Sequence, residues 1–145
     1  KGRIDFESKK AGEEVFNKMY SLIKSGLGIR SIGLIIYASN ASNGEYFDIK
    51  SSYGPYYGSQ FGANKYVSMR DAGNILAGMA AKWGGLSAIQ TYSLFGAFQL
   101  SKNNRSKMPL YIFKALKLGP KGSYGETPIS HIFQKRGYEF NFNMK

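Results

Sequence analysis

Residues 68–83 of the chain read SMRDAGNILAGMAAKW, and this stretch decides the fold. Its apolar side chains recur at intervals of three and four residues, the spacing of one buried helix face: Ala72, Ile75, Leu76, Met79, Ala80 and Trp83. Ser68 and Asp71 fit the looser form of a capping box at its start, and Gly84-Gly85 ends it. We therefore predict a helix over residues 68–83 with one face in the core.

The flanking sequence predicts further helices and a small sheet. Helices are expected over residues 8–25, 87–100 and 129–136, and Ser87 with Gln90 forms a second capping box at the start of the middle one. Strands are expected over residues 31–39, 45–50 and 138–143. The first of these is apolar on both faces, and the second follows an Asn- and Gly-rich turn at 40–44. Residues 110–118 fit helix or strand, whereas 51–68, 101–109 and 119–128 are expected to be loops. The predicted class is α+β, a small antiparallel sheet with packed helices, in a single domain over residues 1–145.

Composition excludes several kinds of site. The 145 residues include no Cys, which rules out disulfides, thiolate-bound zinc, iron–sulfur clusters and a cysteine nucleophile. The single His131 rules out a multi-histidine metal site. No apolar run approaches the ~18–20 residues that span a bilayer, so no transmembrane segment is expected. The start at Lys1 without Met or a signal peptide suggests a piece of a longer, exported protein.

The charge is strongly positive and unevenly distributed. The formal net charge is +11, of which residues 101–145 contribute +7. Such a basic segment predicts a polyanionic partner, whether RNA, DNA, anionic lipid or an acidic protein. The cations expected to contact phosphates are Lys102, Arg105, Lys107, Lys135 and Arg136, although they could equally form an ordinary solvated surface.

Three acidic and basic side chains are candidates for catalysis. On the strand expected at 45–50, Asp48 and Lys50 would share one face, where a carboxylate could hold Mg²⁺ and an ammonium could offset phosphate charge. Asp71 could form a pair with Asp48 as metal ligand or general base. The alternatives are that Asp48 and Lys50 lie on a solvated surface and that Asp71 caps its helix. The catalytic hypothesis requires both carboxylates to meet in one cleft beside the loop at 51–68.

Other side chains are candidates for binding or proton transfer. Asn74, followed by Gly78 one turn later, could present a low polar stripe to a ligand, unless Gly78 only lets a neighbouring helix pack closely. Tyr56 and Tyr57, in a loop that also holds Phe61 and Lys65 and is followed by Arg70, could stack on bases or sugars or pin the loop to the domain. His131 is the one side chain with an ordinary pKa suited to neutral acid–base work, but it could also be structural.

Three motifs resemble the bacterial polymorphic toxin type 44 family: Phe47-Asp-Ile-Lys50, Arg70-Asp-Ala-Gly-Asn74 with Gly78, and Gly96-Ala-Phe-Gln99. They lie within residues 45–100; Phe47 stands where the family usually has Trp, and Ala72 where it often has an aromatic residue. The resemblance implies site roles for Asp48, Lys50, Asp71, Asn74 and Gln99. It also implies a C-terminal toxin module, carried into competing bacteria by an Rhs-type or type VI secretion protein and neutralised by a cognate immunity protein.

These observations lead to three functional hypotheses. The first is an RNA-directed nuclease toxin, in which Asp48, Asp71 and Lys50 act on the phosphodiester, with or without Mg²⁺, and Asn74 and Gln99 orient the substrate. The second is a cell-envelope enzyme such as a peptidoglycan glycosidase, which needs two carboxylates. The third is a membrane-perturbing toxin or a binding module. The net charge further predicts an immunity protein with an acidic contact face.

Overall fold

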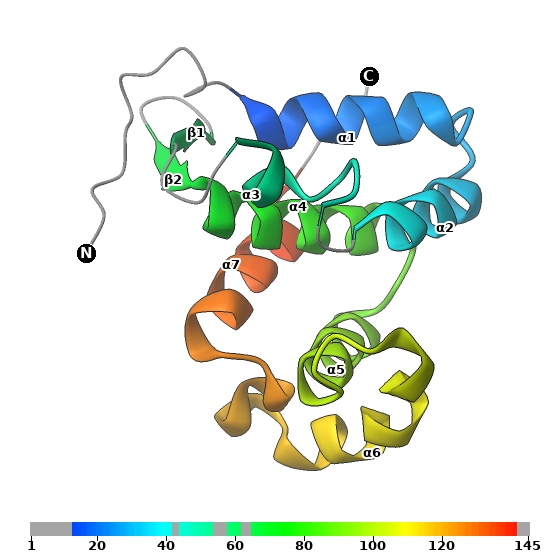
Figure 1. Cartoon of the computed structure of the whole chain (residues 1–145), viewed down its shortest axis with the longest axis vertical. Helices are drawn as coiled ribbons and strands as arrows, with labels where there is room; N and C mark the ends of the chain where they lie inside the picture. The colour runs from blue at the N-terminus through cyan, green and yellow to red at the C-terminus, as the bar shows by residue number, and fades with distance from the viewer. Residues whose placement is uncertain (1–12, 42–43, 54–57, 62–64, 142–145) are drawn as a thin grey trace.

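The computed structural model describes residues 13–41, 44–53, 58–61 and 65–141. This part of the chain is mostly helical and contains one two-stranded antiparallel sheet, so the predicted α+β class is confirmed (Figure 1). Its elements, in chain order, are α1 (Glu14–Ser25), α2 (Arg30–Asn40), α3 (Ile49–Tyr53), β1 (Gly58–Gln60), β2 (Tyr66–Ser68), α4 (Met69–Trp83), α5 (Ala88–Leu100), the 3-10 helix η1 (Arg105–Lys107), α6 (Met108–Leu118), the 3-10 segment η2 (Pro120–Gly125) and α7 (Pro128–Glu139).

Helix α4 is the centre of the core, as its apolar periodicity predicted. Ile75 and Leu76 are fully buried, and Ser68 caps the helix by accepting a hydrogen bond from the Asp71 N–H at 3.3 Å. Helices α1, α2 and α3 pack on one side of α4 and α7 packs on the other (Figure 1). The helix predicted at 68–83 is therefore confirmed.

Helices α4 and α7 cross with their backbones in close approach. A Cβ atom added to Gly78 on α4 would lie 2.6 Å from the Tyr138 nitrogen, and one added to Gly137 on α7 would lie 2.7 Å from the Ile75 carbonyl carbon. Neither position has room for a side chain. Of the two roles considered for Gly78, close helix packing is the one that the geometry bears out.

The positions of the strands were predicted wrongly. Residues 31–39 lie in α2, whose buried residues Gly33 and Tyr37 are four apart and face the core, while Ile35 is 66% exposed. A short apolar run can have the same composition in a buried strand and in a half-buried helix, so the length and composition of residues 31–39 did not distinguish the two. Residues 45–48 form a turn and residues 49–50 begin α3. Residues 138–139 complete α7, residues 140–141 are irregular, and residues 142–143 lie outside the described residues. The sheet lies instead within the expected loop, with Gly58 opposite Ser68.

The chain between α4 and α7 forms a second group of helices. The capping box at Ser87 and Gln90 is present at the start of α5, and the ambiguous segment at 110–118 is helical as part of α6. Helices α5 and α6 pack with η2, after which α7 returns to α4 (Figure 1). Within the described ranges, no helix combines the length and the apolar character that crossing a membrane requires.

Candidate nucleic-acid interface

Asp48 holds the turn before α3 together. Its Oδ2 accepts hydrogen bonds from the Gly44 N–H at 2.9 Å and the Ser51 hydroxyl at 2.6 Å, and its Oδ1 accepts from the Ser51 N–H at 3.3 Å. The carboxylate thereby supplies a capping interaction for α3. The shared strand face with Lys50 was predicted wrongly, because Lys50 is in a helix, where residues two apart do not face each other.

Asp71 lies in the first turn of α4 and keeps one carboxylate oxygen without a hydrogen bond from the described residues. Its Oδ2 accepts from the Ser68 hydroxyl at 2.8 Å, and its Oδ1 lies 3.7 Å from Arg70 Nε. Oδ1 is buried and accepts no hydrogen bond from the described residues. The cap of α4 is thus the Ser68 hydroxyl, which the Asp71 carboxylate holds in place, and one buried carboxylate oxygen of Asp71 is left without a hydrogen bond.

The pairing of Asp48 with Asp71 that the nuclease hypothesis expected stays a prediction. The hydrogen bonds to Asp48 and Asp71 come from their own segments, and neither residue lines either of the two cavities described below. Across residues 13–41, 44–53, 58–61 and 65–141, no group of three or more Asp, Glu or His side chains is arranged to hold a metal ion. This part of the chain does not fit the Mg²⁺ site, so we derive no step through a metal.

Asn74 belongs to a polar network that links α4 to α7. Its Oδ1 accepts from Gln134 Nε2 at 3.1 Å, and its Nδ2 donates to the Arg70 carbonyl at 3.2 Å. Gln134, which is 4% exposed, also donates to Glu126 Oε2 at 3.1 Å. Burial raises the pKa of the Glu126 carboxyl group. Gln134 and Glu126 were not predicted from the sequence, because no local pattern signals a contact between residues 60 positions apart.

His131 lies among aromatic rings where α7 meets α5 and η2. Its ring centroid is 4.9 Å from that of Tyr92 and 5.8 Å from that of Tyr124. Burial, followed by the charge of Lys135, lowers the pKa of the imidazole, so the ring is neutral at pH 7. Burial also raises the pKa of Tyr92 to about 12. The imidazole thus lies in an aromatic packing environment at this helix junction.

The predicted substrate-binding residues are distributed over the molecule. Arg70 and Asn74 are in α4, whereas Gln99 is exposed near the end of α5 and Arg105 is in η1. Arg105 borders an apolar cavity of about 510 Å³ between α2, α4, α5 and α6. Tyr56 and Tyr57 lie outside the described residues.

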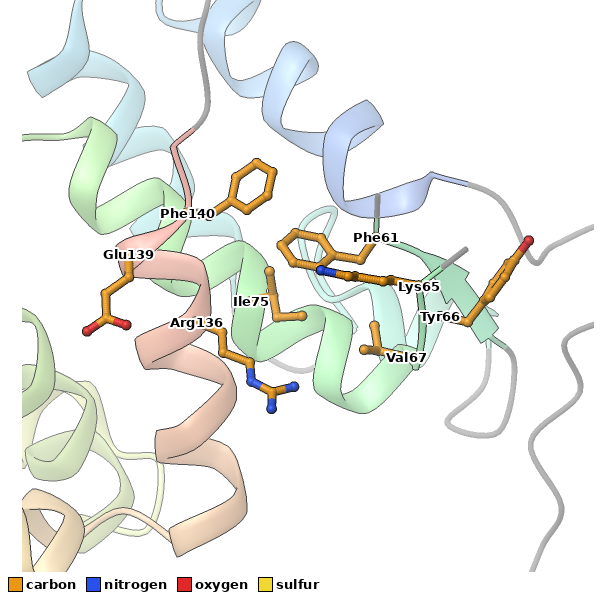
Figure 2. A pocket seen from close by; sticks show the side chains of 8 residues that line it. All are labelled: Phe61, Lys65, Tyr66, Val67, Ile75, Arg136, Glu139 and Phe140. Carbon is orange, nitrogen blue, oxygen red and sulfur yellow. The ribbon is translucent and has the colours of Figure 1, made fainter. Parts of the chain in front are cut away.

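A second cavity combines cations with aromatic rings. It has a volume of about 670 Å³ and is lined by residues of the hairpin segment, α4 and the end of α7: Phe61, Lys65, Tyr66, Val67, Ile75, Arg136, Glu139 and Phe140 (Figure 2). We call it the hairpin pocket. In Figure 2 the side chains of Lys65 and Arg136 lie on opposite sides of Ile75, and the Glu139 carboxylate points away from both. The open rim is therefore positively charged.

Two phenylalanines, Phe61 and Phe140, line the hairpin pocket, and a third, Phe16, packs against both. The rings of Phe61 and Phe140 have centroids 4.8 Å apart, and Phe16 of α1 stacks on Phe61 at 5.6 Å with an interplanar angle of 7°. Both Lys65 and Arg136 are exposed, and the Arg136 guanidinium lies 5.2 Å from the Phe133 ring centroid. Cations beside aromatic rings on a groove are the elements with which proteins bind single-stranded nucleic acids.

Comparison of the chain with protein-family models, curated proteins and solved structures finds no match. The resemblance to type 44 toxins accordingly stays a prediction from three short motifs. What the chain does must therefore be inferred from the hairpin pocket and from the distribution of charge.

Proposed function

We propose that the chain is an antibacterial toxin domain that binds and cleaves RNA, with the RNA strand lying across the hairpin pocket. The observation that carries this proposal is the pairing of Lys65 and Arg136 with the ring cluster of Phe61 and Phe140 at one open cavity. The net charge of +11 supports it, because long-range attraction brings a polyanion to such a surface.

A single strand suits this pocket better than a duplex does. Unpaired bases can stack on exposed ring faces, while lysine and arginine contact the phosphates between them. Paired bases in a duplex present no free faces to Phe61 or Phe140. RNA loops and single-stranded segments are therefore the proposed substrate class.

Among the predicted catalytic residues, we assign the general base to Asp71. Asp71 does not line the pocket, but it precedes Ile75, which does, by four residues and so lies on the same face of α4, one turn away. In the structure its Oδ1 is buried and has no hydrogen bond from the described residues, so the proposal requires this carboxylate to rotate toward the pocket. There it would accept the proton of a ribose 2′-hydroxyl that attacks the adjacent phosphate; a 2′,3′-cyclic phosphate forms as the bond to the 5′-oxygen breaks, and that oxygen takes a proton from water. Arg70, 3.7 Å from this oxygen, would stabilise the charge that develops on the phosphate.

The biological setting proposed here follows from the type 44 resemblance and the charge. A larger secretion protein would deliver the domain into a competing cell, and an immunity protein with an acidic face would protect the producer. Co-expression of the adjacent downstream gene should restore growth of a strain that makes the toxin.

Purified protein tests the activity directly. Wild type is expected to degrade total bacterial RNA in the presence of EDTA, and Asp71→Asn is expected to abolish cleavage because it retains a hydrogen-bonding partner for Ser68 while removing the base. Asp48→Asn is the matched control, since it changes a carboxylate at the start of another helix in the same way. Intact RNA with wild-type protein would refute the proposal. Cleavage by Asp71→Asn at the wild-type rate would refute the assignment of the base alone.

The site of killing separates RNA cleavage from attack on the cell envelope. Cytoplasmic expression of the domain is expected to kill a test bacterium. Killing only when a signal peptide exports the domain to the periplasm would contradict the RNA proposal and favour an envelope enzyme.

A further inference from the structure

Helix α6 presents apolar side chains directly to solvent. Leu110 and Phe113, three residues apart on one face, are 78% and 82% exposed, and Lys114 and Lys117 lie on the same outward half of the helix. We call these four residues the α6 ridge. The opposite face packs against the molecule through Ala115, which is fully buried. The ridge is therefore a projecting surface and not part of the core.

The charge around the α6 ridge has a single sign. Residues 101–125 contain no Asp or Glu, and all of their cations are exposed: Lys102, Arg105, Lys107, Lys114, Lys117 and Lys121. This set is distinct from Lys65 and Arg136 of the hairpin pocket. The segment can thus attract an anionic surface over its whole length.

We propose that the α6 ridge binds the surface of an anionic phospholipid bilayer, with α6 lying in the plane of the headgroups. Interfacial helices combine leucine and phenylalanine, which enter the boundary with the acyl chains, with lysines that contact anionic headgroups. Lys114 and Lys117 can extend their ammonium groups toward the phosphates while Leu110 and Phe113 are buried. The eleven residues of α6 are too few to cross the bilayer, so the helix lies on it.

The exposed apolar side chains favour lipid over nucleic acid. A phosphate backbone would bind the lysines but would give Leu110 and Phe113 no apolar environment. A bilayer binds both groups: its acyl chains accommodate the apolar side chains, and its anionic headgroups attract the lysines. Each Lys or Arg near an anionic membrane contributes about 1 kcal/mol, which is roughly a fivefold change in binding. The membrane proposal does not depend on the RNA proposal.

Co-sedimentation with vesicles tests this surface. The full chain is expected to pellet with vesicles of phosphatidylethanolamine and phosphatidylglycerol, weakly with phosphatidylcholine, and less as salt rises. Lys114→Gln with Lys117→Gln should weaken binding about thirtyfold. Leu110→Ser with Phe113→Ser should weaken it about tenfold or more at unchanged charge.

A matched control removes exposed apolar side chains from another part of the molecule. Leu27→Ser with Ile29→Ser changes two such residues, 85% and 50% exposed, in the turn between α1 and α2 and should leave vesicle binding unchanged. Wild-type binding by the Leu110→Ser/Phe113→Ser variant, or no binding by wild type, would overturn the proposal. The proposal would also be overturned if the ridge variants lost binding to an acidic immunity protein but still bound vesicles like wild type. RNA binding by the Leu110→Ser/Phe113→Ser variant, whose charge is unchanged, should remain intact, which separates this proposal from the first.

Discussion

Replacing Gly78 by Ala should destabilise the protein, even though alanine favours helices. The added Cβ would lie 2.6 Å from the Tyr138 nitrogen and 3.0 Å from the Gln134 carbonyl carbon, whereas ordinary contacts begin near 3.4 Å. Both obstacles are main-chain atoms of α7, so no side chain can rotate away. Relief requires the two helices to separate by a large part of an ångström along their whole crossing.

The net effect follows from two opposing contributions to stability. Alanine in place of glycine favours a helix by about 1 kcal/mol, and overpacking a core typically costs ~1–3 kcal/mol, with rigid backbone obstacles at the upper end. We expect the free energy of unfolding to fall by about 2 kcal/mol. Gly73→Ala, on the same helix, is the matched control, because its Cβ would meet only Ile49 Cγ1 at 3.9 Å. That variant should gain up to about 1 kcal/mol.

Urea unfolding followed by far-UV circular dichroism measures both variants. The expected result is a lower midpoint for Gly78→Ala and an unchanged or higher midpoint for Gly73→Ala, with equal slopes. A Gly78→Ala protein as stable as wild type would refute the close crossing of α4 and α7. That result would also remove the basis for placing Arg136 and Phe140 beside Ile75 in the hairpin pocket.

Three further outcomes test other parts of the structure. Burial lowers the pKa of His131 below 6.5, so as the pH falls the imidazole is protonated in the unfolded state before it is protonated in the folded state. Wild type should therefore lose stability relative to His131→Gln as the pH falls through 6.5. A difference in unfolding free energy between the two proteins that does not change with pH would contradict the buried neutral ring. Ser87→Ala should lower the free energy of unfolding by about 1 kcal/mol, because it removes the hydroxyl that accepts a hydrogen bond from the Gln90 N–H. An unchanged free energy of unfolding would mean that this cap does not stabilise the protein. Tyr138→Phe should cost about 1 kcal/mol because the hydroxyl donates to a main-chain carbonyl at 2.9 Å; unaltered urea unfolding would count against that bond.

Local signals predicted α4 and α5 well. The apolar stripe and cap of α4 and the capping box of α5 are formed by residues within four positions of one another, so the sequence alone determines them. The segment at 31–39 was predicted wrongly because its environment is set by distant residues: Trp83 would collide with any side chain at position 33, so the helix packs through Gly33. The hairpin was missed because β1 and β2 contain only three residues each.

The candidate site was less predictable than the fold. The aromatic loop and the basic residues near the C-terminus are each visible in the sequence, but nothing there indicates that Phe61 and Lys65 meet Arg136 and Phe140 at one cavity. Asp48 was misplaced because its role depends on whether residues 45–50 extend or turn. Only the tertiary crossing of α4 and α7 brings the pocket together.

Binding of a fluorescent single-stranded RNA, measured by anisotropy across a salt series, tests the hairpin pocket most directly. For Lys65→Gln with Arg136→Gln, we predict weaker binding and a salt slope shallower by ~0.7 for each phosphate that the variant no longer neutralises. Lys24→Gln with Arg30→Gln removes the same charge from the end of α1 and the start of α2, remote from the hairpin (Figure 1), and should leave the slope nearly unchanged. Equal effects of the two pairs, or none, would contradict the assignment of RNA to this pocket.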